Sequence, residues 1–101
     1  MNDDKNFDYR TSNSDFATYL LLQGYEYQSI EITIDKKHND RLKAFIHFKG
    51  NKEILIELQD KYENGNVLVE PKLFSITRKK LNKVIKNKLN EYRRVHDITK
   101  K

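Results

Sequence analysis

The chain has 101 residues, of which 35% are charged and 37% hydrophobic, with a formal net charge of +5 and no cysteine. A chain of this length forms one domain with a modest core, and the lack of cysteine excludes disulfides and thiolate metal sites. No apolar run approaches the roughly 18 residues of a membrane span, and the polar, acidic start is not a signal peptide. We therefore expect a cytoplasmic protein without a membrane partner.

The first thirteen residues mix Asn, Asp and Ser with isolated aromatics, a composition that cannot build a core by itself. We predict a flexible arm over residues 1–13, a single domain over 14–94 and a basic tail over 95–101. Arg10 in the arm is a candidate contact for a nucleic-acid backbone or groove, as in other N-terminal arms. The alternative is an inert tail.

The domain is expected to begin with a short helix, capped by Ser12 or Ser14 and ended by Gly24. Two segments of alternating apolar residues follow, over residues 25–35 and 42–49, and predict a β-hairpin. The apolar phase changes within the first of these segments. This change predicts a bulge near Gln28 and Ser29.

The hairpin tip is rich in cations, namely Lys36, Lys37, His38 and Arg41. A cationic hairpin that protrudes from a helical body is typical of a wing that reaches phosphates or a minor groove. An ordinary solvated turn explains the same composition, and the residues alone leave both interpretations open.

Two more helices are predicted after the hairpin. Asn51 suits the cap of the first, whose apolar face holds Ile54, Leu55, Leu58 and Tyr62 and which Gly65 ends. The β-branched run over residues 66–69 predicts a third strand. A long helix then starts at Glu70 or Pro71 and continues to Arg94, because no further Pro or Gly interrupts it.

The long helix carries the positive excess of the chain. From Thr77 onward there are ten Lys or Arg against two acids, whereas the first 76 residues carry ten against thirteen. At the helical period, one face is apolar and the opposite face is cationic, which favours binding to a polyanion. The candidate contacts on this helix are Arg78, Lys79, Lys83 and Lys86. A solvated Lys-rich helix from an AT-rich genome is the alternative.

Residues for catalysis are not arranged in any recognisable pattern. His38, His47 and His96 fall on a turn, a strand and a tail, and the three glycines stand singly at element ends. We therefore predict no enzyme activity, no metal site and no cofactor.

The segments FATYLLLQGYEY at 16–27 and EILIELQDKYENGNVLVEPKLF at 53–74, together with the basic helix, resemble a family of short proteins of phages and plasmids of Gram-positive bacteria. In size, charge and helix-hairpin-helix order the chain also resembles transfer-origin-binding accessory proteins of clostridial conjugative plasmids, the TcpK-like winged-helix homodimers. That resemblance implies a dimer that marks a transfer origin for a relaxase, with residues 35–41 as the wing.

The combined prediction is an α+β, winged-helix-like domain of order α-β-β-α-(β)-α with a hairpin wing and a long basic C-terminal helix. We predict a non-enzymatic protein that binds double-stranded DNA, as an accessory factor at a plasmid transfer origin in conjugation. A homodimer is expected, through the long helix or an exposed strand edge. The alternative is a phage or plasmid protein that uses its basic face to inhibit or recruit a protein partner.

Overall fold

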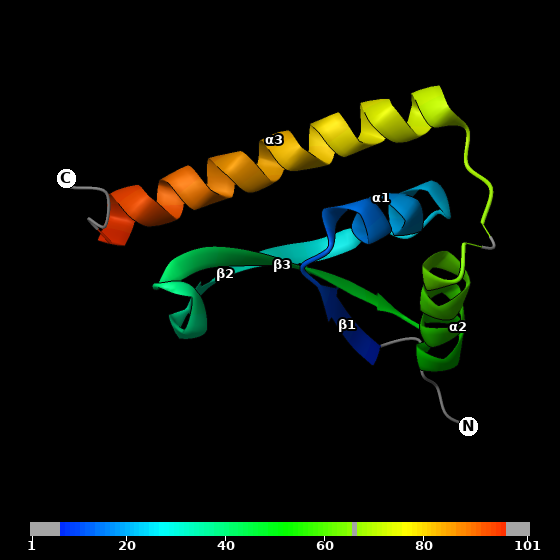
Figure 1. Ribbon diagram of the computed structural model, residues 1–101, viewed down its shortest axis with the longest axis horizontal. Coiled ribbons are helices and arrows are strands. Elements are labelled where there is room, and N and C mark those ends of the chain that lie inside the picture. Colours follow the sequence, from blue (N-terminus) through cyan, green and yellow to red (C-terminus); the bar gives the residue numbers. More distant parts are fainter. Residues whose placement is uncertain (1–6, 66, 97–101) are drawn as a thin grey trace.

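The computed structural model describes residues 7–65 and 67–96, apart from the side chains of His38 and His96. Within these residues the chain forms three α-helices and a three-stranded antiparallel sheet, which confirms the predicted α+β class (Figure 1). In chain order the elements are β1 (Phe7–Thr11), α1 (Ser14–Leu22), β2 (Tyr27–Asp35), the 3₁₀-helix η2 (Lys36–His38), β3 (Arg41–Gly50), α2 (Lys52–Glu63) and α3 (Pro71–His96).

The sheet has the strand order β1-β3-β2, with both neighbours of β3 antiparallel to it. The strands β2 and β3 form the predicted hairpin, joined by η2 and by Asn39 and Asp40 in the left-handed backbone region. The register shifts between Tyr27 and Ser29. The bulge expected from the phase change in the sequence is therefore confirmed.

The first strand, β1, was not predicted. Residues 7–11, expected to belong to a flexible arm, pair with β3 so that Tyr9 lies opposite Phe48. The hydroxyl of Tyr9 donates a hydrogen bond to Gln59 Oε1 at 2.8 Å, and its ring packs against that of Phe16 in a T-shaped arrangement. These long-range contacts hold the segment, and the observed order starts with a strand rather than a helix. The rest of the predicted arm, residues 1–6, lies outside the described residues.

The helix boundaries follow local capping chemistry. Asn13, rather than Ser12 or Ser14, caps α1 by accepting hydrogen bonds from the backbone N–H of Asp15 and Phe16. Asn51 caps α2 as predicted, through a 3.1 Å bond from the N–H of Ile54. Gly24 and Gly65, with φ of 99° and 75°, follow the ends of α1 and α2 in a conformation that favours glycine.

The long helix α3 starts at Pro71, as expected from the sequence, and the side chain of Glu70 accepts the N–H of Leu73. It ends at His96, two residues beyond the predicted end, and residues 97–101 of the expected tail lie outside the described residues. The predicted third strand over 66–69 is wrong for residues 67–69, which form no strand, and Asn66 is not among the described residues.

The core lies between the sheet, α1, α2 and α3. Its buried apolar side chains are Phe16, Ala17, Tyr19, Leu20, Ile46, Phe48, Leu55 and Leu81. Leu81 is the only residue of this group on α3, and Phe74 and Ile85, half-buried on the same helix, pack beside it. Ile54, predicted on the apolar face of α2, is instead 48% exposed. The helix α3 therefore covers the body with its apolar side and leaves its cationic side outside.

Candidate nucleic-acid interface

The strongest candidate for a nucleic-acid interface is the outer face of α3. This face is exposed because the apolar face of the helix packs against the body. The side chains of Leu81, Ile85 and Tyr92 are buried or half-buried, whereas Lys79 and Lys83 are exposed. The exposed cations of this outer face are Lys72, Lys79, Lys83, Lys86 and Arg94. We refer to these five residues as the α3 cation row.

The α3 cation row is regular because its members are spaced by three, four, seven or eight residues. At 1.5 Å of rise per residue, the row from Lys72 to Arg94 extends over about 33 Å. Glu91 is the one acid among the residues of α3, and it lies toward Ile30 and Ile32 of the sheet rather than in the row. The row therefore presents positive charge over nearly the whole length of the helix.

The cations of the row differ from Arg10, Lys61 and Arg78 in that no described acid is paired with them. Among the described residues, Lys79, Lys83 and Lys86 take part in no ion pair, whereas Lys61 of α2 lies 3.8 Å from Glu57. Cations in an uncompensated row keep their full attraction for an anion. Phosphates at the spacing of a nucleic-acid backbone are suitable partners for such a row.

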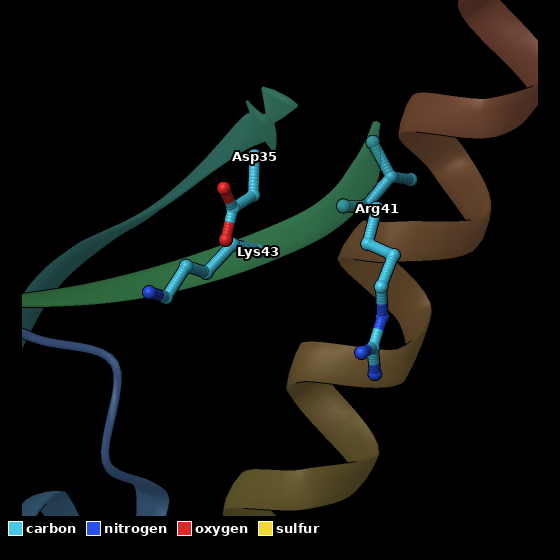
Figure 2. A pocket seen from close by; sticks show the side chains of 4 residues that line it. Asp35, Arg41 and Lys43 are labelled. Atoms are coloured by element: carbon cyan, nitrogen blue, oxygen red, sulfur yellow. The ribbon is translucent and has the colours of Figure 1, made fainter. Parts of the chain in front are cut away.

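The hairpin tip forms a second group of cations. Lys36 and Lys37 are exposed in η2, and Asp35 fixes this turn by accepting the backbone N–H of Lys37 at 3.1 Å. Arg41 and Lys43 are exposed at the start of β3, beside a hollow that Asp35 also lines. Figure 2 shows the side chains of Arg41 and Lys43 leaving the strand in different directions. The tip therefore offers dispersed charges. The side chain of His38, also predicted here, lies outside the described part.

Arg78, a predicted contact on α3, is engaged within the molecule. It lies 3.3 Å from Asp15, so it links α3 to α1 near the start of that helix. Both side chains remain about half exposed. Arg78 is therefore less available for a phosphate than the cations of the α3 cation row.

Arg10, the predicted contact in the arm, is also engaged. Its guanidinium lies 3.4 Å from Glu31 Oε1 and 4.2 Å from the ring centroid of Phe45. Arg10 lies opposite His47 in the strand register, on the face of the sheet turned away from the buried Ile46 and Phe48. Arg10 and the α3 cation row thus belong to opposite sides of the molecule.

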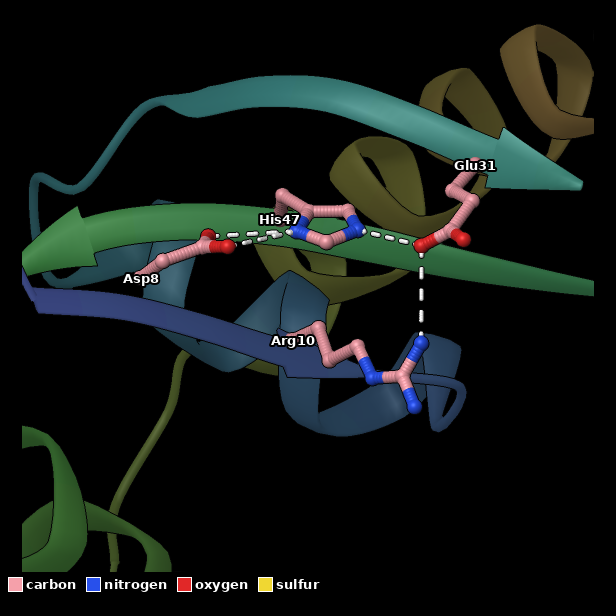
Figure 3. Close-up of polar contacts among 4 residues, drawn as sticks. All are labelled: Asp8, Arg10, Glu31 and His47. Atoms are coloured by element: carbon pink, nitrogen blue, oxygen red, sulfur yellow. Dashed lines mark hydrogen bonds and ion pairs between the residues drawn. The ribbon is translucent and has the colours of Figure 1, made fainter.

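The sequence did not reveal a network of charges on this outer face of the sheet. His47 on β3 bonds to Asp8 of β1 through Nδ1, at 3.1 Å, and to Glu31 of β2 through Nε2, at 2.8 Å (Figure 3). Arg10 completes the network through Glu31. We call these four residues the sheet charge network. One imidazole thereby connects all three strands.

The network changes the protonation of its members. Partial burial acts to lower the pKa of His47, but its hydrogen bonds to Glu31 and Asp8 outweigh this effect and raise the pKa above 6.5. The hydrogen bond from His47 also holds the pKa of Glu31 below 4.5. The charged forms are therefore favoured, and the network is self-compensating.

The network does not resemble a metal site, because each ring nitrogen of His47 already contacts a different carboxylate. No group of three His, Cys, Asp or Glu suited to a metal ion occurs within residues 7–65 and 67–96. None of the helices there is long and apolar enough to cross a membrane.

Comparison of the chain with protein-family models, curated proteins and solved structures found no match. The charge, pairing and exposure of the described side chains are therefore the basis for a function.

Proposed function

We propose that this protein binds double-stranded DNA, with the α3 cation row as its main contact, and that it does so without catalysing a reaction. The observation that carries the proposal is the row itself, in which exposed Lys79, Lys83 and Lys86 have no acidic partner among the described residues. Two other candidate cations, Arg10 and Arg78, contact carboxylates instead, and those of the hairpin tip are dispersed around a turn.

The lysines of the row supply affinity through phosphates, and this part of the binding is independent of sequence. The β2–β3 hairpin supplies the second contact, in the manner of a wing. Arg41 is the residue there best suited to enter a groove, because its guanidinium has the fork of donors that reads base edges. The assignment of the domain as winged-helix-like is also part of this proposal, because it depends on the hairpin acting as a wing.

The biological role follows from the resemblance to transfer-origin-binding proteins. In this role the protein is a cytoplasmic accessory factor that marks the transfer origin of a plasmid for a relaxase. The row of phosphate contacts holds the protein on DNA, and the hairpin selects the site.

The experiment is a fluorescence-anisotropy titration against a labelled duplex from the intergenic region of the protein's own genetic element and a scrambled duplex, each at two salt concentrations. Tighter, salt-sensitive binding to the native duplex supports site-specific DNA binding. With about five phosphates contacted, the logarithm of affinity falls against the logarithm of salt with a slope of about −4 to −5. A response to salt that is flat contradicts the proposal and directs the search to a protein partner.

A further inference from the structure

Within the described residues, no strand adds to the outer side of β2, and this edge strand is longer than β1 at the other border of the sheet. The strand order places Tyr27–Asp35 at an edge, with β3 on its inner side only. Above this edge α3 does not close fully on the sheet. It leaves a hollow of about 340 Å³ lined by Ile30, Ile32, Tyr92 and Val95, with Lys88 and Glu91 at its polar side. Apolar side chains at the border remain accessible, since Ile34 is 40% and Val95 69% exposed.

The two edge strands of the sheet differ in their protection. Edge strand β1 has five residues, and α2 packs beside it. Edge strand β2 has nine residues and contains no Pro or Lys, the residues most often used to protect an edge from strand addition, although it carries the carboxylates of Glu31 and Asp35. The one irregularity of β2 is the bulge at its Tyr27 end. From Ser29 to Asp35 the strand keeps a regular register with β3, so its outer edge is a regular template for another strand.

We propose that a second copy of this chain adds to this edge, antiparallel and with Ile32 on the twofold axis, to form a continuous six-stranded sheet. A twofold axis at Ile32 places Ile30 opposite Ile34 of the second copy, so the isoleucines of both copies share one face. Glu31 then lies opposite Thr33, and Ser29 lies opposite Asp35.

The carboxylates on β2 select this register from its neighbours. An axis at Glu31 places two copies of that carboxylate opposite each other, and an axis at Thr33 places Glu31 opposite Asp35. Like charges in directly opposed positions destabilise a strand pair. The axis at Ile32 avoids both arrangements and pairs seven residues of each strand, from 29 to 35. The edge is thus complementary to itself.

The proposed strand-edge dimer does not depend on DNA binding, but it affects the surface that is available to DNA. Residues opposite each other in an antiparallel pair lie on the same face of the sheet, so both copies of α3 cover the same side of the six strands. The two α3 cation rows then belong to one surface. An isolated copy offers half of that charge.

The first test is sedimentation velocity of the full chain over a range of concentrations, with Ile34→Glu and Ile54→Glu as a matched pair. Both isoleucines are nearly half exposed, but Ile54 lies on α2. We expect a dimer whose dissociation constant rises about tenfold or more for Ile34→Glu, because each dimer receives two charges at the interface, and is unchanged for Ile54→Glu. A monomeric wild type, or equal effects of the two changes, overturns the proposal.

The second test determines the register of the two β2 strands in the dimer, and it does not require the Ile34→Glu variant to fold. Because the chain has no cysteine, Ile32→Cys and Ile30→Cys each introduce a single thiol. Under mild oxidation Ile32→Cys forms a disulfide-linked dimer across the axis, whereas Ile30→Cys stays unlinked, because its two thiols are four residues apart along the strands. Circular dichroism verifies that both are folded. Folded Ile32→Cys that remains unlinked, or equal linking of both, contradicts the register.

Discussion

The outer face of the sheet and the outer face of α3 both carry cations, but in opposite circumstances. On the sheet, Arg10 and His47 are bonded to Glu31 and Asp8, so that the charges compensate one another across three strands. On α3, Lys79, Lys83 and Lys86 stand in a row with no described acid paired to them. Positive charge by itself therefore does not locate a binding surface. The better guide is a regular row of cations along one face with no described acidic partner, since scattered cations such as Lys49 also take part in no described ion pair.

The largest expected effect comes from reversing the charge of the row. The triple change of Lys79, Lys83 and Lys86 to Glu should weaken binding to a duplex by about a hundredfold or more at low salt, because three phosphate contacts become repulsive. Fluorescence anisotropy measures this loss.

The matched control is the triple change of Lys49, Lys52 and Lys61 to Glu, which alters net charge by the same amount on β3 and α2. We expect a loss of less than about tenfold, since only the general field of the protein changes. Equal losses for the two triple variants are inconsistent with a localised surface on α3.

A smaller effect is expected at the hairpin tip. Changing Lys36, Lys37 and Arg41 to Ala should weaken duplex binding by about tenfold, because these dispersed cations add to a contact that α3 already provides. The ratio of affinities for native and scrambled duplexes should fall as well, if Arg41 enters a groove. A loss of duplex affinity larger than that of the α3 triple variant would make the hairpin tip, rather than α3, the main contact.

The sheet charge network should affect stability and its pH dependence. Folding raises the pKa of His47 above 6.5, so its contribution is present below that pH and is lost as the pH rises through the raised pKa. Folding lowers the pKa of Glu31 below 4.5, so its contribution is lost as the pH falls through that lowered value. In thermal melts, His47→Gln should therefore lower Tm by a few degrees near about pH 5.5 and by less near about pH 8. A deficit that is larger at high pH disproves the assignment.

The smallest effect on binding is expected for Arg10→Gln. The change removes the contacts of Arg10 with Glu31 and Phe45 but leaves the α3 cation row intact. Duplex affinity should change by less than about twofold, while Tm falls slightly, since exposed pairs contribute little. A large loss of affinity places Arg10 in the interface, as the sequence first indicated.

The helical parts of the fold could be predicted because their signals are local. In the 26-residue helix α3, the helical period places Leu81 and Ile85 on one face and Lys79 and Lys83 on the other. The exposure of these four residues confirms that prediction. The bulge of β2 could also be predicted, because the alternation of apolar residues changes phase at that point of the strand. These features need no knowledge of distant residues.

The parts that could not be predicted depend on residues far apart in the chain. Strand β1 has five residues, and its place is fixed by contacts such as that of Tyr9 with Gln59, fifty positions away. The pairing of Arg78 with Asp15 spans sixty-three positions. Whether a cation is free or paired is decided by such contacts, so the sequence grouped Arg10 and Arg78 with the lysines of α3.

NMR tests directly which of the two faces binds DNA. An unlabelled duplex is added to ¹⁵N-labelled protein, and the amide resonances are followed. We predict that shifts concentrate at Lys79, Lys83 and Lys86, while Asp8, Arg10 and Glu31 remain unchanged. Shifts concentrated in the sheet charge network, with α3 unaffected, would contradict the assignment of DNA binding to the α3 cation row.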